Sequence, residues 1–392
     1  MIQDAMLSSH QLLRLQQRAF MTGIFALMLC GAGAFANPTQ FFHSYLFAYV
    51  YWSGIPIGAL AIIMLHHLTG GAWGLVIRRI LEAATRTLPI VALLFIPVVI
   101  GMKDIYEWAQ PDVVQADRVL QEKASYLNVP FFLVRSAFYF LAWFLLSRRL
   151  NAWSRQQDET GDPTLVLRME TLSAPGLVLF GATVTFASFD WVMSLEPHWY
   201  STVFGLSFMV GQVLTAFPFA IGVAVLLSKQ EPMSEAISPS HFQDLGKLTL
   251  AFVMLWAYLS FSQFLIIWSA NLPEETQYYV KRLHGGWQFL QLMLIVFHFA
   301  LPFMLLLSRS LKRSAPRLAK VVIIILLIRF ADIYLQILPA GHQSRFHLHW
   351  MDIIAPIGVG GIWVSYYVRQ LAARPVLPLR DASFKEVLES GH

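Results

Sequence analysis

The stretch FDWVMSLEPHWYSTVFG, residues 189–205, decides how the rest of the chain is interpreted. It places Asp190, Glu196 and His198 among apolar and aromatic residues, in a turn between two long hydrophobic runs. Ionisable side chains are expensive inside a bilayer and normally face the interior of a helix bundle. The depth of these three residues relative to a membrane therefore decides whether they belong to an interior site or to a surface.

Hydrophobic segments recur on both sides of this stretch. Of the 392 residues, 57% are apolar and 13% are charged, whereas soluble domains carry about 25% charged residues. The mean hydropathy is +0.57. Runs of this kind predict an all-α polytopic membrane protein. The net charge of +5 comes from short basic clusters beside hydrophobic runs, which favours membrane topology over nucleic-acid binding.

We expect about ten transmembrane helices in a single domain over residues 1–372, followed by a cytoplasmic tail at 373–392. The first apolar run resembles a signal peptide, but we interpret it as an uncleaved span. The ten predicted spans are 20–36, 43–67, 87–103, 130–148, 174–194, 203–227, 246–268, 285–308, 317–338 and 351–372.

The segment GGAWGLVIRRILEAATRT, residues 70–87, lies between the second and third spans. Its apolar residues recur at helical spacing, and Arg78, Arg79, Glu82 and Arg86 occupy the remaining positions. This pattern predicts an amphipathic helix lying at the membrane interface.

The distribution of basic residues predicts the orientation. With the amino terminus in the cytoplasm, 20 of the 28 Lys and Arg residues fall in cytoplasmic segments and six fall in outer loops. Cytoplasmic loops carry the excess of these residues, so both termini are expected in the cytoplasm. The longest outer loop, about 104–129, is mixed in charge, which suits either a solvated loop or docking to another protein.

Four ionisable residues fall inside predicted spans at a similar depth in the outer half of the membrane: Arg135, Asp190, Arg329 and Asp332. Arg329 and Asp332 are three residues apart and can share one helix face, which leaves Asp190 as the partner for Arg135. One explanation is a set of structural ion pairs. The other is a polar, partly hydrated cavity that opens outward and lets protons leave.

Glu196 and His198 are expected at the outer membrane surface. Histidine titrates near neutral pH, and a neighbouring Glu can orient it or accept its proton. The alternative is an aromatic interface belt, because Trp199 and Tyr200 follow directly and such residues concentrate at that depth.

Weaker candidates lie toward the inner side. His66 and His67 end the second span, Lys247 opens the seventh, and His298 lies deep in the eighth, four residues before Pro302. A proline breaks the helical hydrogen-bond pattern, frees a carbonyl and favours local hydration. These residues predict a sparse inner half-channel, with a satisfied interior histidine as the alternative for His298.

Histidine spacing predicts that this chain binds no haem. His284 and His298 are fourteen residues apart, a spacing that suits two haem levels, but the second span offers only His43 and His66, twenty-three apart. Each bis-histidine haem needs a matched pair on two helices. The single cysteine, Cys30, and the absence of carboxylate clusters also argue against Fe–S, Zn or Cu sites. We therefore expect no metal and no cofactor bound by this chain.

The second half of the chain resembles the F-type membrane subunits of alternative complex III, a bacterial quinol:electron-acceptor oxidoreductase, within the wider polysulfide-reductase-like (NrfD-type) family. The stretches that carry this resemblance mix polar and aromatic residues without interruption. They are FDWVMSLEPHWYSTVFG (189–205), WSANLPEETQYYVKRLHGGW (268–287), VFHFALPFMLLLSRSLKR (296–313), RFADIYLQILP (329–339) and FHLHWMDIIAPIGVGGIW (346–363).

The resemblance implies two four-helix bundles with two peripheral helices in the bacterial cytoplasmic (inner) membrane. It implies a related NrfD-like membrane subunit, an iron–sulfur subunit and haem c subunits as partners, which would hold the redox centres. It assigns the better-supported quinol site to the related membrane subunit and leaves open whether quinone also binds this chain. The polar positions of the family map onto Asp190, His198, His284, His298, Arg329, Asp332 and Asp352. In the tail, Arg380, Asp381 and Ala382 depart from the family pattern.

Three functional hypotheses follow. The first is a non-haem membrane subunit of a quinol-oxidising electron-transfer complex, respiratory or photosynthetic, that contributes a proton path. The second is a secondary transporter that uses its intramembrane charges, although clear inverted repeats and paired broken helices are not visible in the sequence. The third is a structural scaffold within the same complex.

Overall fold

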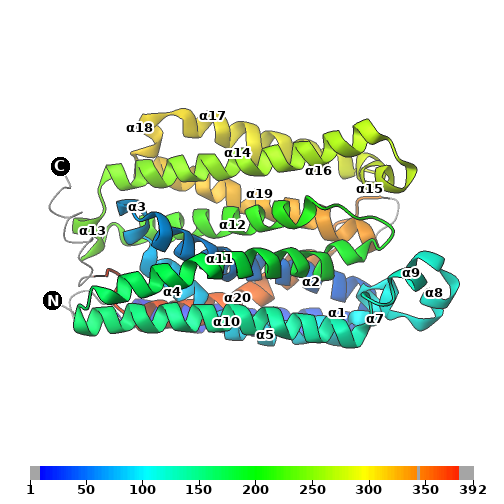
Figure 1. Ribbon diagram of the computed structural model, residues 1–392, viewed down its shortest axis with the longest axis horizontal. Helices are drawn as coiled ribbons and strands as arrows, with labels where there is room; N and C mark the ends of the chain where they lie inside the picture. The colour runs from blue at the N-terminus through cyan, green and yellow to red at the C-terminus, as the bar shows by residue number, and fades with distance from the viewer. Residues whose placement is uncertain (1–8, 342–344, 379–392) are drawn as a thin grey trace.

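A computed structural model describes residues 9–341 and 345–378, and the described residues form helices and connecting turns without a strand. The long helices run side by side along the long axis of the molecule (Figure 1). Two ends result, which we name by the short helices they carry. The α18 end carries α18 (Arg309–Lys312), and the α15 end carries α15 (Pro273–Leu283). The predicted all-α polytopic membrane fold is confirmed.

Nine segments among the described residues are long and apolar enough to cross a membrane. Three of them are divided into consecutive helices, at 78–100, 164–195 and 287–307. The helices that make up the nine segments are α2 (Pro38–Thr69), α4 (Arg78–Thr85) with α5 (Leu88–Leu94) and α6 (Ile96–Ile100), α10 (Val129–Thr160), α11 (Thr164–Trp191) with the 3-10 turn η2 (Met193–Leu195), α12 (Phe204–Leu227), α14 (Pro239–Ala270), α16 (Trp287–Met293) with the π-helix η3 (Leu294–Ala300) and α17 (Leu301–Leu307), α19 (Ala315–Gly341) and α20 (Trp350–Ala372).

Short helices fill the connections. At the α15 end these are α7, the 3-10 turn η1, α8 and α9, and at the α18 end they include α3 and α13 (Figure 1). Their bounds are α3 (Ala72–Leu75), α7 (Met102–Ile105), η1 (Glu107–Ala109), α8 (Pro111–Ala116), α9 (Arg118–Lys123) and α13 (Met233–Ala236).

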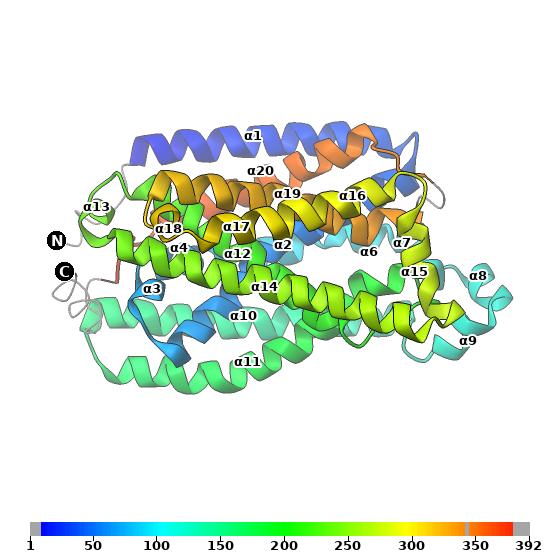
Figure 2. The ribbon, with the colours of Figure 1, turned by 90° about the horizontal axis from the view of Figure 1, so that it is seen from above.

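The first predicted span, 20–36, lies almost entirely within α1 (Ser9–Ala34), which is not among the nine segments. The first half of this helix carries Arg14, Arg18 and several glutamines, so its apolar part is short. Figure 2 shows α1 beside α20 along most of its length. The predicted tail is described only as far as residue 378, so Arg380, Asp381 and Ala382 lie outside the described residues.

Helix α2 is the centre of the fold. It packs against α4, α11, α12, α19 and α20, and nearly all of its apolar span is buried inside the protein. A helix that is apolar on every side needs apolar surroundings on every side, either other helices or lipid. The run 45–64 of α2 has only Ser53 as a hydroxyl besides its tyrosines, and other helices supply almost all of its surroundings.

Apart from α20, the nine spans of the described chain form two groups of four helices. One group consists of α2, α4–α6, α10 and α11, and the other of α12, α14, η3 with α16 and α17, and α19. The two groups meet where α2 and α11 pack on α12 and where α2 packs on α19. Helices α1 and α20 lie against α2 at the periphery, as Figure 2 shows.

The amphipathic helix predicted within residues 70–87 is present, but its predicted position at the membrane interface is wrong. Residues 78–85 form α4, and all eight are buried, including Arg78, Arg79 and Glu82. The sequence period showed an apolar face and a charged face, but it could not show that α10 and α11 supply polar partners to the charged face. The side chains that were expected to meet lipid headgroups meet protein groups instead.

Helices α1 and α20 approach each other closely because glycines face each other. A Cβ placed on Gly361 would lie 2.5 Å from the Cα of Gly23 and 2.6 Å from the carbonyl oxygen of Ala19. Small residues at such contacts let transmembrane helices pack backbone to backbone.

Gly361→Ala is expected to lower the stability of the protein by about 1–3 kcal/mol, because the added methyl group must push two helix backbones apart. The measurement is the unfolding free energy in detergent micelles. Gly31→Ala is the matched control, because a Cβ on Gly31 of α1 would meet no atom within 4 Å. Equal effects of the two substitutions would contradict the packing explanation.

Candidate functional site

Arg135 and Asp190 form the first buried charged centre. Arg135 of α10 donates from Nε and Nη2 to the two carboxylate oxygens of Asp190 in α11, at 2.9 and 2.8 Å. The Tyr139 hydroxyl donates to the same carboxylate at 2.8 Å, and Arg135 also donates to the Tyr126 carbonyl at 3.0 Å. Asp190 is completely buried. The predicted pairing of Arg135 with Asp190 is confirmed.

Aromatic side chains enclose this centre. The guanidinium of Arg135 lies 3.9 Å from the ring centroid of Tyr126 and 4.2 Å from that of Phe131. Trp191, next to Asp190, is buried among further aromatic rings. A bidentate ion pair whose carboxylate accepts a third hydrogen bond is fully satisfied. The geometry therefore favours a structural role for Asp190.

Arg329 and Asp332 form the second buried charged centre, which we call the Asp332 site. The two side chains are paired within α19, as their spacing predicted. Asp332 also accepts from the indole N–H of Trp256 in α14 at 3.1 Å and from the amide of Gln336 at 3.0 Å. Arg329 donates to the Thr215 hydroxyl of α12 at 3.2 Å. Three helices of the second group thus supply the site.

The Asp332 site contains polar atoms without a partner among the described residues. Nη2 of Arg329 and both ring nitrogens of His298 are buried and make no hydrogen bond there. The His298 ring stands perpendicular to the Trp256 indole, with centroids 4.3 Å apart. Most buried polar groups in proteins are satisfied. His298 therefore departs from the satisfied interior histidine that was the alternative prediction.

His298 lies in the π-helix η3, four residues before Pro302 of α17. Proline has no N–H, and its ring collides with the carbonyl of the residue four positions earlier in an α-helix, which here is His298. The wider turn of a π-helix accommodates this disruption, and such turns occur frequently at functional sites. The break that the sequence predicted at Pro302 is therefore present.

A line of polar contacts runs from Asp332 toward the α15 end. The side-chain amide of Gln336 donates to Asp332, the backbone carbonyl of Gln336 accepts from Arg282 at 3.4 Å, and Arg282 donates to Glu196 at 2.7 Å. Arg282 is 2% exposed and Glu196 is 17% exposed on its side chain. Glu196 is therefore the point where this line approaches the surface.

Tyr278 lies beside the charged residues of this line. Its ring centroid lies 3.5 Å from the Arg282 guanidinium, and its ring stacks on Trp199 at 3.9 Å. Burial raises the pKa of Tyr278 to about 12, and the charges of Glu196 and Asp332 contribute to the increase while Arg282 opposes it. The Asp332 site and the Glu196 ion pair thus act on the same side chain.

Glu196 and His198 do not pair with each other. The Glu196 carboxylate accepts from Arg282 of α15 at 2.7 Å, whereas Nε2 of His198 lies 2.7 Å from Asp117 in the 104–129 segment. The two residues belong to an end cap that ties the α11–α12 turn to α15 and to α9. The prediction that the Glu orients the neighbouring His is wrong, because consecutive turn residues point to different elements.

Asp117 caps α9, and its lowered pKa predicts that the stability of α9 depends on pH. Loss of hydration alone raises the pKa of this carboxyl, but hydrogen bonds from the Leu120 N–H and from His198 outweigh that effect, so the pKa lies below its usual 3.8. A carboxyl with a lowered folded-state pKa stabilises the fold above its unfolded pKa and loses that contribution as the pH falls through the folded value.

We therefore expect the α9 amides to keep their hydrogen-exchange protection above pH 3.8 and to lose it progressively below that value. Asp117→Asn should remove most of this pH dependence, because the amide does not titrate. The measurement is exchange with correction for the intrinsic rate. A wild-type profile that matches the variant at every pH would contradict the assignment.

The inner candidates do not form one half-channel. His66 bonds through Nε2 to the Gly71 carbonyl at 3.1 Å and packs on Trp73, and the His67 ring lies 6.0 Å from it. Lys247 pairs with Asp244 at 2.8 Å, and both side chains are about half exposed. Of these candidates only His298 reaches the Asp332 site, because His66 and His67 lie in the last turn of α2 and Lys247 lies in the first third of α14, toward the α18 end.

Among the described residues, no hydrogen bond or ion pair joins Asp190 to the Asp332 site. The four charged residues of the predicted shared cavity are therefore two separate centres, one in each helix group. Similar depth along the helices did not imply the same place across the membrane plane.

Asp352 is a third buried acid, and its contacts are structural. Its two oxygens accept from Gln40 at 3.0 Å, Ser44 at 2.5 Å, Tyr334 at 3.0 Å and the His349 N–H at 2.9 Å. The last bond closes a capping box at the start of α20. This carboxylate holds α2, α19 and α20 together.

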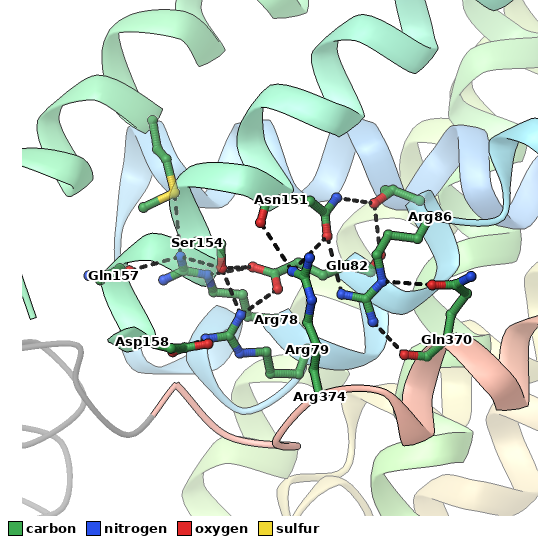
Figure 3. A network of polar contacts seen from close by, with 12 residues as sticks. Arg78, Arg79, Glu82, Arg86, Asn151, Ser154, Gln157, Asp158, Gln370 and Arg374 are labelled. Atoms are coloured by element: carbon green, nitrogen blue, oxygen red, sulfur yellow. Dashed lines mark hydrogen bonds and ion pairs between the residues drawn. The ribbon is translucent and has the colours of Figure 1, made fainter. Parts of the chain in front are cut away.

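The sequence interpretation missed a buried arginine network at the α18 end (Figure 3). Glu82 accepts from Arg78 at 3.0 Å, from Arg79 at 2.6 Å and from the Ser154 hydroxyl at 2.6 Å. Arg79 also pairs with Asp158. The signal in the sequence was an i, i+4 pairing of Arg78 with Glu82, which indicates a helix without telling whether it is buried.

Neither the site geometry nor sequence comparison identifies a cofactor or a family. In the described part of the chain, no three His, Cys, Asp or Glu residues are grouped so that they could hold a metal ion. No protein-family model and no curated protein matches the sequence.

Proposed function

We propose that this chain is an integral membrane subunit of a quinol-oxidising electron-transfer complex of the alternative complex III type. The resemblance of residues 189–363 to that family supports this proposal, as does the grouping of the spans into two four-helix groups with α1 and α20 outside them. Bacterial inner-membrane location, cytoplasmic termini and the partner subunits with haem c and iron–sulfur centres belong to the same proposal.

The observation that carries the functional part is the Asp332 site. It combines a carboxylate that can gain a proton with an imidazole that has no hydrogen-bond partner among the described residues, inside apolar spans. Intramembrane acids and histidines of this kind mark proton relays. The hydrogen bonds from Asp332 through Gln336 and Arg282 to Glu196 form a line of polar groups that leads toward the α15 end.

In this proposal, Asp332 and His298 take up and release protons within the membrane, and Glu196 passes them to water at the α15 end. Arg329 holds the carboxylate charged between transfers, while Trp256 and Gln336 fix its orientation. In this proposal the related membrane subunit holds the main quinol site, because the resemblance assigns the better-supported quinol site to it.

Co-purification tests the assignment. A tag on this chain should bring down subunits whose visible absorbance is that of haem c, together with quinol oxidation by the purified sample. A transporter would purify without haem-bearing partners. Recovery of the chain without either property, from membranes that oxidise quinol, would contradict the proposal.

A further inference from the structure

A cleft opens beside the buried arginine network at the α18 end, on the outside of the first helix group. Its volume is about 510 Å³, and α10, the junction between α4 and α5 and the end of α20 line it. Its cationic lining residues are Arg86, Arg148, Arg155 and Arg374. Nothing in the proposed proton path uses this cleft.

The cleft has an excess of positive charge. Among the described residues that line it, one is acidic, Glu159, and it pairs with Arg155 at 2.8 Å. Arg86 donates to the Gln370 carbonyl and to the Asn151 side chain, and Arg374 donates to Asn151, so these contacts are to uncharged oxygens. Guanidinium groups are planar donors that match the geometry of phosphate oxygens. An anion is therefore the ligand whose charge fits the cleft.

The inner wall of the cleft is built from buried residues. Asn151 is 5% exposed, and its amide donates to the Thr85 hydroxyl at 3.0 Å while its oxygen accepts from Arg86 at 3.4 Å. Figure 3 shows Arg86 and Arg374 converging on Asn151, with Gln370 on the other side of Arg86. Burial lowers the pKa of Arg374, because the guanidinium has lost part of its hydration. These cations are held in place by protein groups before any ligand arrives.

An apolar stripe leads from the cleft along the outer face of α10. Phe138, Leu141 and Leu145 are 53%, 54% and 47% exposed. Their spacing of three and four residues continues to Arg148, so all four side chains lie on one helix face. Leu93 at the end of α5 is 59% exposed on the neighbouring segment. The surface is thus cationic at the α18 end and apolar farther along the membrane-spanning part.

We propose that this cleft binds the phosphodiester headgroup of an anionic phospholipid whose acyl chains lie along the apolar stripe of α10. A free phosphate would use the arginines but not the stripe, whereas a zwitterionic lipid would use the stripe without matching the charge. Basic clefts between helix ends at the cytoplasmic leaflet are suited to such headgroups. The basic loops of this chain gather at the same end, which is the side that anionic lipids of that leaflet would face.

Lipid retention tests the proposal. The complex is purified in detergent, delipidated, and titrated with cardiolipin, with phosphatidylglycerol or with phosphatidylcholine, and bound lipid is counted by native mass spectrometry. The test variant is Arg148→Gln with Arg155→Gln, because both residues are exposed and their loss leaves the buried wall intact. The matched control is Arg168→Gln, an exposed arginine of α11 that does not line the cleft.

We expect the wild-type complex and the Arg168→Gln control to bind the anionic lipids in a saturable way. The double variant should bind them about 30-fold more weakly, as two arginines near a membrane surface would predict. Equal anionic-lipid affinity in the double variant would overturn the proposal. Equal occupancy by phosphatidylcholine, or complete displacement of the lipid by millimolar inorganic phosphate, would overturn it as well.

Discussion

Replacing Arg135 by Ala is expected to lower the unfolding free energy by about 3–5 kcal/mol, because the substitution leaves the Asp190 carboxylate buried without its cation. Asp190 is fully buried, and among the described residues Tyr139 would remain as the side-chain donor to its carboxylate. The arginine also contacts the rings of Tyr126 and Phe131, and those contacts are lost too. Unfolding of the purified protein in detergent micelles measures the effect.

Two control variants distinguish the loss of a buried ion pair from the general effect of removing an arginine. Arg118→Ala removes an exposed ion pair with Glu122 and should cost only about 0–1 kcal/mol. The double substitution Arg135→Leu with Asp190→Leu removes both charges and should recover part of the loss, because no isolated charge remains. If the double variant were as unstable as Arg135→Ala, an uncompensated Asp190 charge would not be the cause.

Replacing Asp332 by Asn should lower quinol-dependent turnover of the assembled complex by about 100-fold or more, which is the lower range for loss of a positioned proton-transfer group. Asn keeps an oxygen that can accept from Trp256, so the shape of the site is retained, but it cannot carry a proton. The measurement is turnover together with proton release per electron, in samples that contain equal amounts of assembled complex.

Loss of the Asp332 charge also leaves Arg329 buried alone, which could weaken folding. The double variant Asp332→Asn with Arg329→Gln is neutral and separates the two effects: it should assemble normally and remain slow. Asp190→Asn is the matched acid from the other centre, and it should reduce assembly more than turnover. Normal turnover and unchanged proton release in the neutral double variant would exclude Asp332 from a proton path.

These two predictions differ because the structure divides the charged residues by helix group. Asp190 is enclosed by a bidentate arginine, a tyrosine and aromatic rings. The Asp332 site keeps buried polar atoms without partners among the described residues and is connected by hydrogen bonds toward Glu196. The Asp190 carboxylate has its hydrogen bonds satisfied, which favours a packing role, whereas the imidazole of His298, which has no partner among the described residues, is a group that calls for an explanation such as proton binding.

Much of the fold was predictable from the sequence, because hydrophobic length is a local property. A run of about 20 apolar residues spans the bilayer core whatever its neighbours are, so nine of the ten predicted spans correspond to segments of the described chain that are long and apolar enough to cross a membrane. The pairing of Arg329 with Asp332 was predictable for the same reason, since both lie within one turn of one helix.

Partner choice between distant segments was decided by the tertiary structure. The sequence offered Asp190 to Arg135 because few other in-span charges were available, but it could not show that Glu196 pairs with Arg282, 86 positions away. The amphipathic pattern of residues 70–87 fits a membrane interface and a buried helix equally well, and only the polar side chains of α10, with the thioether sulfur of Met169 in α11, place α4 inside.

The turn at residues 189–205 shows both sides of this division. Its composition determined that an acid lies within a span and that a Glu and a His follow at the membrane surface, because burial of charge is costly enough to restrict where such residues can occur. The packing of α10, α15 and α9 around that stretch determined the rest. It directed Asp190 to one helix group, Glu196 to the other and His198 to the end loop, because side chains a few residues apart in a turn point toward different neighbours.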